Sequence, residues 1–180
     1  MVKAVFLDRD GTINKHVIRD NPKHVAPWYY AEFEYIDGVP EAVAAIKRMG
    51  FTTHLVTNQP DVDDGLMTEE TLDAIHLMLK NELKLDTIQA ARTRHTPEYK
   101  PNPGMLENII KKFNVSVNRS YMVGDTWRDV VAGHRAGVTT IYLGNGYHCP
   151  EEFKDIQPDH TVADLTEAAK IIAMGETWYD

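Results

Sequence analysis

The stretch "FLDRDGTIN" (residues 6–14) places Asp8 and Asp10 one residue apart, directly after the chain's first apolar run. Residues i and i+2 of a strand point to the same side, so the two carboxylates are expected to project together as the strand ends, with Arg9 pointing elsewhere. Gly11 then allows the chain to turn sharply. Two adjacent carboxylates favour a cation site, and Mg²⁺ fits because it prefers oxygen ligands. The alternative is a solvated turn with a helix cap.

Apolar, β-rich runs alternate with amphipathic segments along the rest of the chain. Strands are predicted at 3–8, 51–58, 87–92, 120–125 and 139–145. Helices are predicted at 38–50, 67–85, 103–114, 126–137 and 164–175. This alternation predicts an α/β fold: a Rossmann-like, doubly wound parallel sheet with helices on both faces.

Three connections are longer than the rest, and they follow the first, second and third strands: 14–37, 59–67 and 92–102. All three therefore lie at the carboxyl edge of the sheet, where ligands bind in open α/β sheets. None is long enough to form a separate cap domain, so we expect a minimal cap made of loop insertions on one domain spanning 1–180.

A second acidic cluster, "GDTWRD" (124–129), follows the strand predicted at 120–125. Asp125 stands at the carboxyl end of that strand, and Asp129 lies four residues later on the same face of the following helix. We expect Asp125 to bind the metal. Asp129 is either a further metal ligand or the acidic partner of Thr126 in a capping box.

Three further residues reach the same edge. Thr57 and Asn58 end the second strand and could hold phosphate oxygens beside free helix N–H groups, and Lys100 lies just ahead of another helix start. In isolation these would be a turn pair and a surface lysine. Together with the two acidic clusters they form a set suited to phosphoryl transfer: a carboxylate nucleophile, an acid/base, a metal and groups for phosphate oxygens.

Composition limits the other possibilities. The formal net charge of −8 over 180 residues argues against a nucleic-acid partner, which a basic stripe would bind. No apolar run approaches the ~20 residues of a membrane span. Cys149 is the only cysteine, so an intrachain disulfide is excluded and a reducing compartment is favoured. We expect a cytoplasmic protein, a monomer, that acts on a small phosphorylated metabolite.

The chain resembles the haloacid dehalogenase superfamily of phosphohydrolases. The resemblance rests on four motifs that occur in the expected order: "DRDGT" (8–12), "VTN" (56–58), Lys100 and "GDTWRD" (124–129). The resemblance implies that Asp8 attacks phosphorus and that Asp10 serves as general acid and then as general base. It implies that Thr57 and Lys100 hold the transferring phosphoryl group. The metal ligands that it implies are Asp8, the backbone carbonyl of Asp10, Asp125 and Asp129.

Within the superfamily, the motifs look like the small-capped branch that includes heptose-1,7-bisphosphate and histidinol-phosphate phosphatases. That resemblance implies a Mg²⁺-dependent phosphomonoesterase for a phosphorylated sugar, with a heptose bisphosphate as first expectation. Histidinol phosphate or another small metabolite is the alternative. A polynucleotide 3′-phosphatase is less favoured because this chain has no basic tract to support it. A phospho-receiver domain is also less favoured, because it would place its acidic pair apart from the nucleophile.

The chain departs from the branch in two places. Heptose phosphatases usually carry a zinc loop of three cysteines and a histidine before the lysine, but "ARTRHTPEYKP" (91–101) keeps only His95, so zinc is not expected. The insert 15–36 carries an aromatic cluster that could line the substrate's path or pack as a flap or subunit contact. Its members are Trp28, Tyr29, Tyr30, Phe33 and Tyr35.

The remaining residues expected to contact the substrate lie in turns and loops or at a strand end. Arg92 and Arg94 could reach a second anionic group on the substrate, or they could be solvated. Gly11, Thr12 and Asn58 are expected beside the phosphate.

Overall fold

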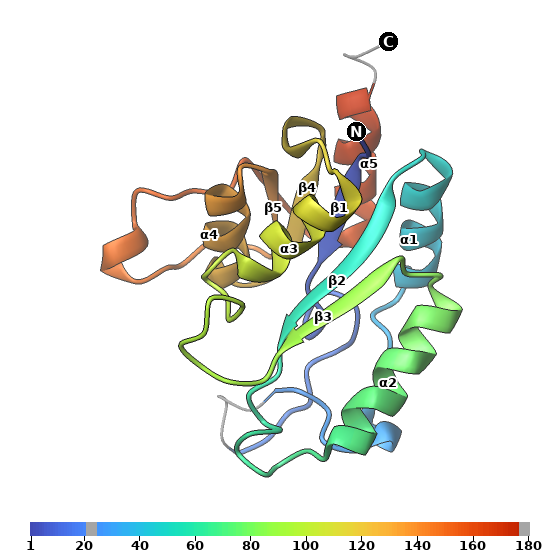
Figure 1. The fold of residues 1–180 in the computed structure, drawn as a ribbon, viewed down its shortest axis with the longest axis vertical. Helices are drawn as coiled ribbons and strands as arrows, with labels where there is room; N and C mark the ends of the chain where they lie inside the picture. The colour runs from blue at the N-terminus through green and yellow to red at the C-terminus, as the bar shows by residue number, and fades with distance from the viewer. Residues whose placement is uncertain (21–24, 177–180) are drawn as a thin grey trace.

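Six parallel strands form one sheet in a computed structural model that describes residues 1–20 and 25–176 (Figure 1). The strands are β1 Ala4–Leu7, β2 Thr52–Asn58, β3 Thr87–Ala91, β4 Tyr121–Gly124, β5 Thr139–Leu143 and β6 His160–Val162. The helices are α1 Val39–Arg48, α2 Glu69–Glu82, α3 Gly104–Phe113, α4 Trp127–Ala136 and α5 Leu165–Glu176. The predicted α/β class and parallel sheet are confirmed.

Helices cover both faces of the sheet, so β1 is buried along its whole length. Val5 and Leu7 point to the face covered by α1, α2 and α5, and they belong to the larger apolar core. Phe6 points to the opposite face, where it packs with residues of α3 and α4. This two-sided burial explains why the first strand reads as an unbroken apolar run.

The strand order is β3-β2-β1-β4-β5-β6, so the winding direction reverses beside β1. The chain runs outward from β1 through β2 to β3, then returns to the other side of β1 as β4. Loops leaving β1 and β4 diverge at this point, which opens a crevice at the carboxyl edge of the sheet. The two acidic clusters of the sequence leave these two neighbouring strands.

The sequence prediction omitted β6. This strand has three residues, pairs with β5 at the sheet edge, and exposes His160 and Thr161. Neither its length nor its side chains give the apolar run on which strand prediction depends. The 3-10 turns Tyr30–Glu32, Val117–Arg119 and Glu151–Phe153 lie in connections. No helix in the described ranges is long and apolar enough to cross a membrane.

The insert 15–36 packs against the loop after β2; its residues 21–24 lie outside the described part. The Glu32 carboxylate accepts hydrogen bonds from Arg19 Nη2 at 2.7 Å and from the Trp28 backbone N–H at 2.8 Å. The Arg19 guanidinium lies 3.9 Å from the centroid of the Trp28 ring. Trp28 Nε1 donates to Asp61 at 2.7 Å, which ties the insert to the loop 59–67.

Candidate active site

The two acidic clusters meet where β1 and β4 end, because two glycines permit a very close approach. Gly11 has a φ of +85°, and a Cβ there would lie 2.1 Å from Asp125 Oδ2. A Cβ on Gly124 would lie 2.3 Å from Asp129 Cγ. Neither position can accept a side chain without displacing a carboxylate, so both glycines are required by the geometry of the site.

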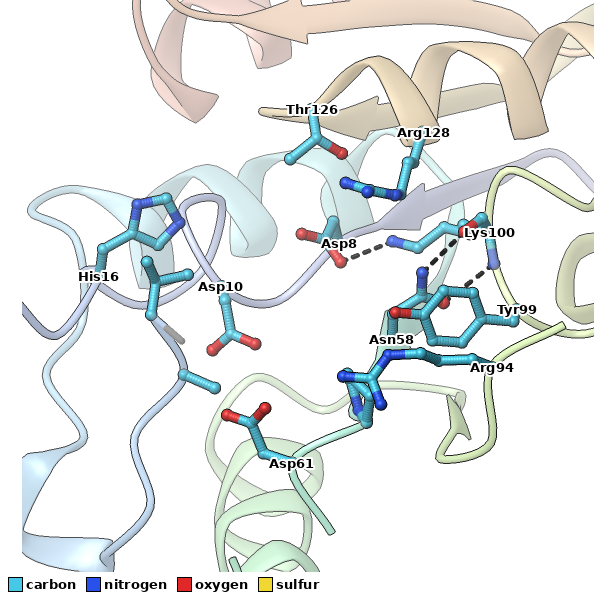
Figure 2. A pocket seen from close by; sticks show the side chains of 13 residues that line it. Asp8, Asp10, His16, Asn58, Asp61, Arg94, Tyr99, Lys100, Thr126 and Arg128 are labelled. Atoms are coloured by element: carbon cyan, nitrogen blue, oxygen red, sulfur yellow. Dashed lines mark hydrogen bonds and ion pairs between the residues drawn. The ribbon is translucent and has the colours of Figure 1, made fainter. Parts of the chain in front are cut away.

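Lys100 joins the two acidic clusters by pairing with one aspartate of each, and Figure 2 shows its contact with Asp8. Its Nζ donates to Asp8 Oδ1 and to Asp129 Oδ1, both at 2.6 Å, and to the Val56 carbonyl at 2.8 Å. The Lys100 side chain is only 3% exposed. Burial disfavours the charged lysine, but the two carboxylates outweigh burial and raise its pKa above the ordinary value.

Asn58 sets the position of Lys100 through its backbone. The Lys100 N–H donates to Asn58 Oδ1 and the Asn58 amide donates to the Lys100 carbonyl, both at 2.9 Å. The amide of Asn58 is thus engaged with the chain, although the residue lines the pocket. Its Nδ2 keeps a second N–H, so the predicted contact with phosphate stays a prediction.

Asp129 forms the capping box that was one of its two alternatives, while its role as a metal ligand stays a prediction. Its Oδ2 accepts from the Thr126 backbone N–H at 3.0 Å and from Thr126 Oγ1 at 2.7 Å, which completes a capping box at the start of α4. Its Oδ1 faces Lys100 and the acidic cluster. One carboxylate therefore both caps the helix and belongs to the site.

Asp8, Asp125 and Asp129 form a candidate metal centre. Each offers a carboxylate oxygen within 4.8 Å of the others. Asp125 Oδ1 is buried and has no hydrogen-bond partner among the described residues, although Oδ2 lies 3.3 Å from His16 Nε2. Burial, followed by the charges of the neighbouring carboxylates, raises the pKa of Asp125.

Burial likewise raises the pKa of Asp8, and Lys100 offsets only part of the effect. Three carboxylates around one lysine leave excess negative charge with an unpartnered oxygen, which fits a divalent cation held by oxygen ligands. The Asp10 carboxylate is not part of this cluster.

Asp10 is held in a separate hydrogen-bond network. Arg9 donates from Nε and Nη2 to its Oδ1 at 3.1 and 3.0 Å, and from Nη2 to its Oδ2 at 3.1 Å. Asn14 donates to Oδ1 at 3.0 Å and Gln59 to Oδ2 at 2.7 Å. Burial alone would raise the pKa of Asp10, but the Arg9 charge and these bonds lower it overall.

The expectation that Arg9 points away from the two aspartates is wrong. Its side chain is fully buried and reaches back to Asp10 and to Gln59 Oε1, the latter at 2.8 Å. Alternation of side chains ends with β1 at Leu7, so it does not govern residues that are already in the turn. His76 Nε2 lies 3.4 Å from Arg9 Nη1 on the far side.

The other predicted phosphate-binding residues are buried beside this network. Thr57 is 1% exposed, and its Oγ1 accepts from Gln59 at 2.8 Å, so Gln59 joins Thr57 to Asp10. Thr12 is fully buried, and its Oγ1 has no partner among the described residues. Gly11 approaches Asp125 and does not line the pocket.

Above these groups lies a pocket of about 720 Å³ (Figure 2). It is lined by Asp8, Asp10, His16, Val25, Ala26, Asn58, Pro60, Asp61, Arg94, Tyr99, Lys100, Thr126 and Arg128. The insert contributes His16, Val25 and Ala26 but none of its predicted aromatic side chains. Trp28 instead bonds to Asp61, so the flap alternative fits better.

The two loop arginines lie in different places. Arg94 lines the pocket and forms a bidentate ion pair with Asp64, with both N–O distances 2.7 Å. Arg92 lies outside this pocket, against Glu69 at 2.8 Å and Asp73 at 3.8 Å. The structure thus gives no support to the predicted substrate contact of Arg92.

Sequence reasoning missed several residues of the site. Arg9 and Gln59 organise Asp10, and His16, Tyr99 and Arg128 line the pocket. The acidic residue at position 10 could have indicated a need for a cationic partner, and Arg9 is the nearest in sequence. Arg128 is an exposed arginine on a helix, a position that usually indicates only a solvated face.

Comparisons with known proteins agree with this geometry. A family model described as HAD-hydrolase-like matches residues 99–168. A D-glycero-D-manno-heptose-1,7-bisphosphate 7-phosphatase of Chlorobaculum tepidum is 32% identical, with 97% of this chain and 96% of the relative covered. A D-glycero-beta-D-manno-heptose-1,7-bisphosphate 7-phosphatase of Pasteurella multocida is 33% identical, covering 96% and 97%.

A solved structure extends the similarity to the fold. The D,D-heptose 1,7-bisphosphate phosphatase of B. bronchiseptica, complexed with magnesium and phosphate, superposes with a TM-score of 0.78 at 26% identity. The superposition covers 96% of this chain and 99% of that one. With full-length similarity in sequence and fold, and the acidic clusters meeting at one edge of the sheet, the chain belongs to the haloacid dehalogenase-like phosphatases.

Proposed function

We propose that this phosphatase is a Mg²⁺-dependent phosphomonoesterase for a phosphorylated sugar, and that a heptose bisphosphate is its substrate. The observation that carries the reaction type is the arrangement of Asp8. Its carboxylate lies against Lys100 in the acidic cluster, at the floor of the pocket and next to the separately held Asp10. The relatives named as heptose-1,7-bisphosphate phosphatases support the substrate class.

In the proposed first half-reaction, a carboxylate oxygen of Asp8 attacks phosphorus and the bond to the sugar oxygen breaks. Asp10 gives its proton to the departing oxygen, and an aspartyl-phosphate remains on Asp8. In the second half-reaction Asp10 takes a proton from water, which attacks phosphorus and releases inorganic phosphate and free Asp8. Lys100 and Thr57 hold oxygens of the phosphoryl group during transfer.

Asp10 must therefore alternate between its two protonation states. The network around Arg9 favours the carboxylate, which is the form that the second half-reaction needs. A phosphate dianion beside Asp10 opposes this preference, because a nearby like charge raises the pKa of a carboxyl group. Substrate binding thus favours the protonated form that the first half-reaction needs.

Asp8, Asp125 and Asp129 would hold the metal ion, with the Asp10 carbonyl as a further ligand. When bound, Mg²⁺ supplies positive charge that offsets repulsion between the Asp8 carboxylate and the phosphate. The test is release of phosphate from a panel of phosphorylated metabolites, measured with Mg²⁺ and with excess EDTA. We expect activity to stop in EDTA and to return with added Mg²⁺; full activity in EDTA would contradict the proposal.

The substrate is tested in the same panel. We expect heptose 1,7-bisphosphate to have a higher kcat/KM than heptose monophosphate, and histidinol phosphate to be poorer than either. A higher kcat/KM for histidinol phosphate would replace the heptose assignment while leaving the phosphatase assignment in place. Elemental analysis should find no stoichiometric zinc, because the segment 91–101 has no thiolate ligands.

A further inference from the structure

The four positively charged or titratable basic side chains that line the pocket differ in what they contact. Lys100 is bound by Asp8 and Asp129. Arg94 is bound through two 2.7 Å contacts by Asp64, and His16 lies 3.3 Å from Asp125. Arg128 is the exception, because it has no carboxylate partner among the described residues.

Arg128 lies against the ring of Trp127. Its guanidinium carbon lies 4.8 Å from the centroid of the Trp127 ring, and Trp127 stacks on Phe153 at 5.0 Å with an interplanar angle of 23°. The ring attracts the positive charge through its π electrons, and this contact does not use the N–H groups as hydrogen-bond donors. The guanidinium therefore keeps its N–H groups for a ligand, and Figure 2 shows it extending over the side of the pocket that holds Asp8 and Lys100.

An incoming anion must displace different groups to bind Arg128 and to bind Arg94. To bind Arg94, the anion must displace Asp64 from a bidentate ion pair or share the guanidinium with it. To bind Arg128, it displaces only water. Arginine binds phosphate and carboxylate with two parallel hydrogen bonds, so an unpaired, pre-positioned guanidinium is the stronger site for an anion.

We propose that Arg128 is a specificity-determining residue that binds a second anionic group of the substrate, distinct from the phosphoryl group transferred to Asp8. The ligand class is a small phosphate ester with a further phosphate or carboxylate. Arg94 then has a different role: with Asp64 it ties the loop after β3 to the loop after β2. The inference rests on the proposed phosphatase reaction and names which residue selects its substrates.

The test compares Arg128→Ala with Arg94→Ala on a matched pair of substrates, fructose 1,6-bisphosphate and fructose 6-phosphate. The quantity measured is the ratio of kcat/KM for the bisphosphate to kcat/KM for the monophosphate. Loss of a charge-assisted contact predicts that Arg128→Ala lowers this ratio about 10–100-fold, chiefly through the KM of the bisphosphate. Arg94→Ala should change it by less than about threefold.

A third variant separates charge from geometry. Arg128→Lys keeps the charge but loses the planar fork, so its ratio should lie between those of wild type and Arg128→Ala. An unchanged ratio in Arg128→Ala would overturn the inference, as would a larger effect in Arg94→Ala. Equal losses on both substrates would also overturn it, because Arg128 would then contact the transferred phosphoryl group.

Failure of the phosphatase reaction is visible separately. It would appear as no phosphate release by the wild-type protein from any ester with Mg²⁺. In that case, equilibrium binding of fructose 1,6-bisphosphate still tests Arg128 without turnover. Weaker binding in Arg128→Ala than in Arg94→Ala supports the site, and equal binding in both variants and wild type overturns it.

Discussion

The floor and the rim of the pocket are built differently. The floor comprises Asp8, Asp10, Lys100, Asp125 and Asp129; its Lys100 and Asp129 side chains are 3% and 1% exposed. The rim comprises Arg94, Asp64 and Arg128; the Arg94 and Asp64 side chains are 42% and 31% exposed. Ion pairs in the floor are shielded from water, whereas exposed pairs in the rim are screened and contribute little to stability.

The difference separates two functions. The floor residues are held by the sheet: Asp8, Asp10 and Asp125 follow strand ends, and Lys100 is fixed by Asn58 at the end of β2. The rim residues Asp64 and Arg94 lie in the long connections 59–67 and 92–102, and Arg128 is an exposed residue of α4, so these positions can change without disturbing the sheet. We therefore expect floor variants to lose turnover on every substrate and rim variants to change the choice of substrate.

The largest effect is expected for Asp8→Asn in the floor. The amide is nearly isosteric with the carboxylate but is not a nucleophile, so turnover should be abolished while the fold is retained. Phosphate release and circular dichroism check the two parts of this prediction, and the exposed Asp155→Asn serves as the matched control. Substantial residual activity in a preparation free of contaminating phosphatase would remove Asp8 from its proposed role.

The second-largest effect is expected for Arg9→Met, which removes the cation that orients Asp10. If Asp10 transfers protons, its misplacement should lower kcat/KM by about 10²-fold or more on an alkyl phosphate. The loss should be smaller on p-nitrophenyl phosphate, whose leaving oxygen needs little protonation. Arg48→Met, at an exposed arginine of α1, is the control.

Two results would separate a positioning role of Arg9 from a purely structural one. Arg9→Lys should recover part of the activity, because it restores a charge near Asp10. Equal losses on the alkyl and aryl substrates, in variants that remain folded, would show that Arg9 does not act through proton transfer by Asp10.

Burial also predicts a pH dependence of stability away from the floor. His54 lies between Phe6 and Phe113, and burial lowers its pKa to about 4 from an ordinary value of 6.5. Between these values His54 binds more protons in the unfolded chain than in the folded chain, so its contribution to the free energy of unfolding falls as pH decreases from about 6.5 toward 4. Across this range, urea unfolding should show that His54→Phe loses less stability with falling pH than wild type does.

His76 contributes to the same decrease, because burial lowers its pKa to about 3, with Arg9 adding to the effect. His54→Phe should therefore reduce the acid sensitivity without removing it. The same pH dependence in both proteins would show that His54 is not buried in its neutral form.

The smallest effect is expected in the rim, for Asp64→Asn. The variant weakens the ion pair with Arg94, and an exposed pair of this kind contributes about 1 kcal/mol or less. Turnover of a monophosphate and the urea midpoint should both stay close to wild type. A loss of turnover comparable to that of Arg9→Met would show that floor and rim are not functionally separate.

Much of the floor could be predicted from sequence because its residues follow apolar runs. Asp8 and Asp125 come directly after buried strands, and parallel strands bring such positions to one edge. The capping residue Thr126 could be predicted from its spacing to Asp129. The fold was predictable for the same reason, apart from β6, whose exposed side chains leave no apolar run.

The remaining features depend on contacts that no local pattern encodes. Arginine is rarely buried completely, so nothing in the sequence separates Arg9 from a solvated arginine. Arg94 and Arg128 both read as exposed loop or helix cations. Only the structure shows that Asp64 binds one of them and that Trp127 supports the other.

The central claim, that the floor transfers phosphate through Asp8, is tested most directly by trapping the intermediate. Borohydride reduces an acyl phosphate to an alcohol, so quenching the enzyme during turnover with borohydride should convert Asp8 to homoserine, identified by peptide mass spectrometry. We predict this conversion at Asp8 in the presence of Mg²⁺ and substrate, and its absence without substrate. Conversion of a different aspartate under the same conditions, with Asp8 unmodified, would contradict the account.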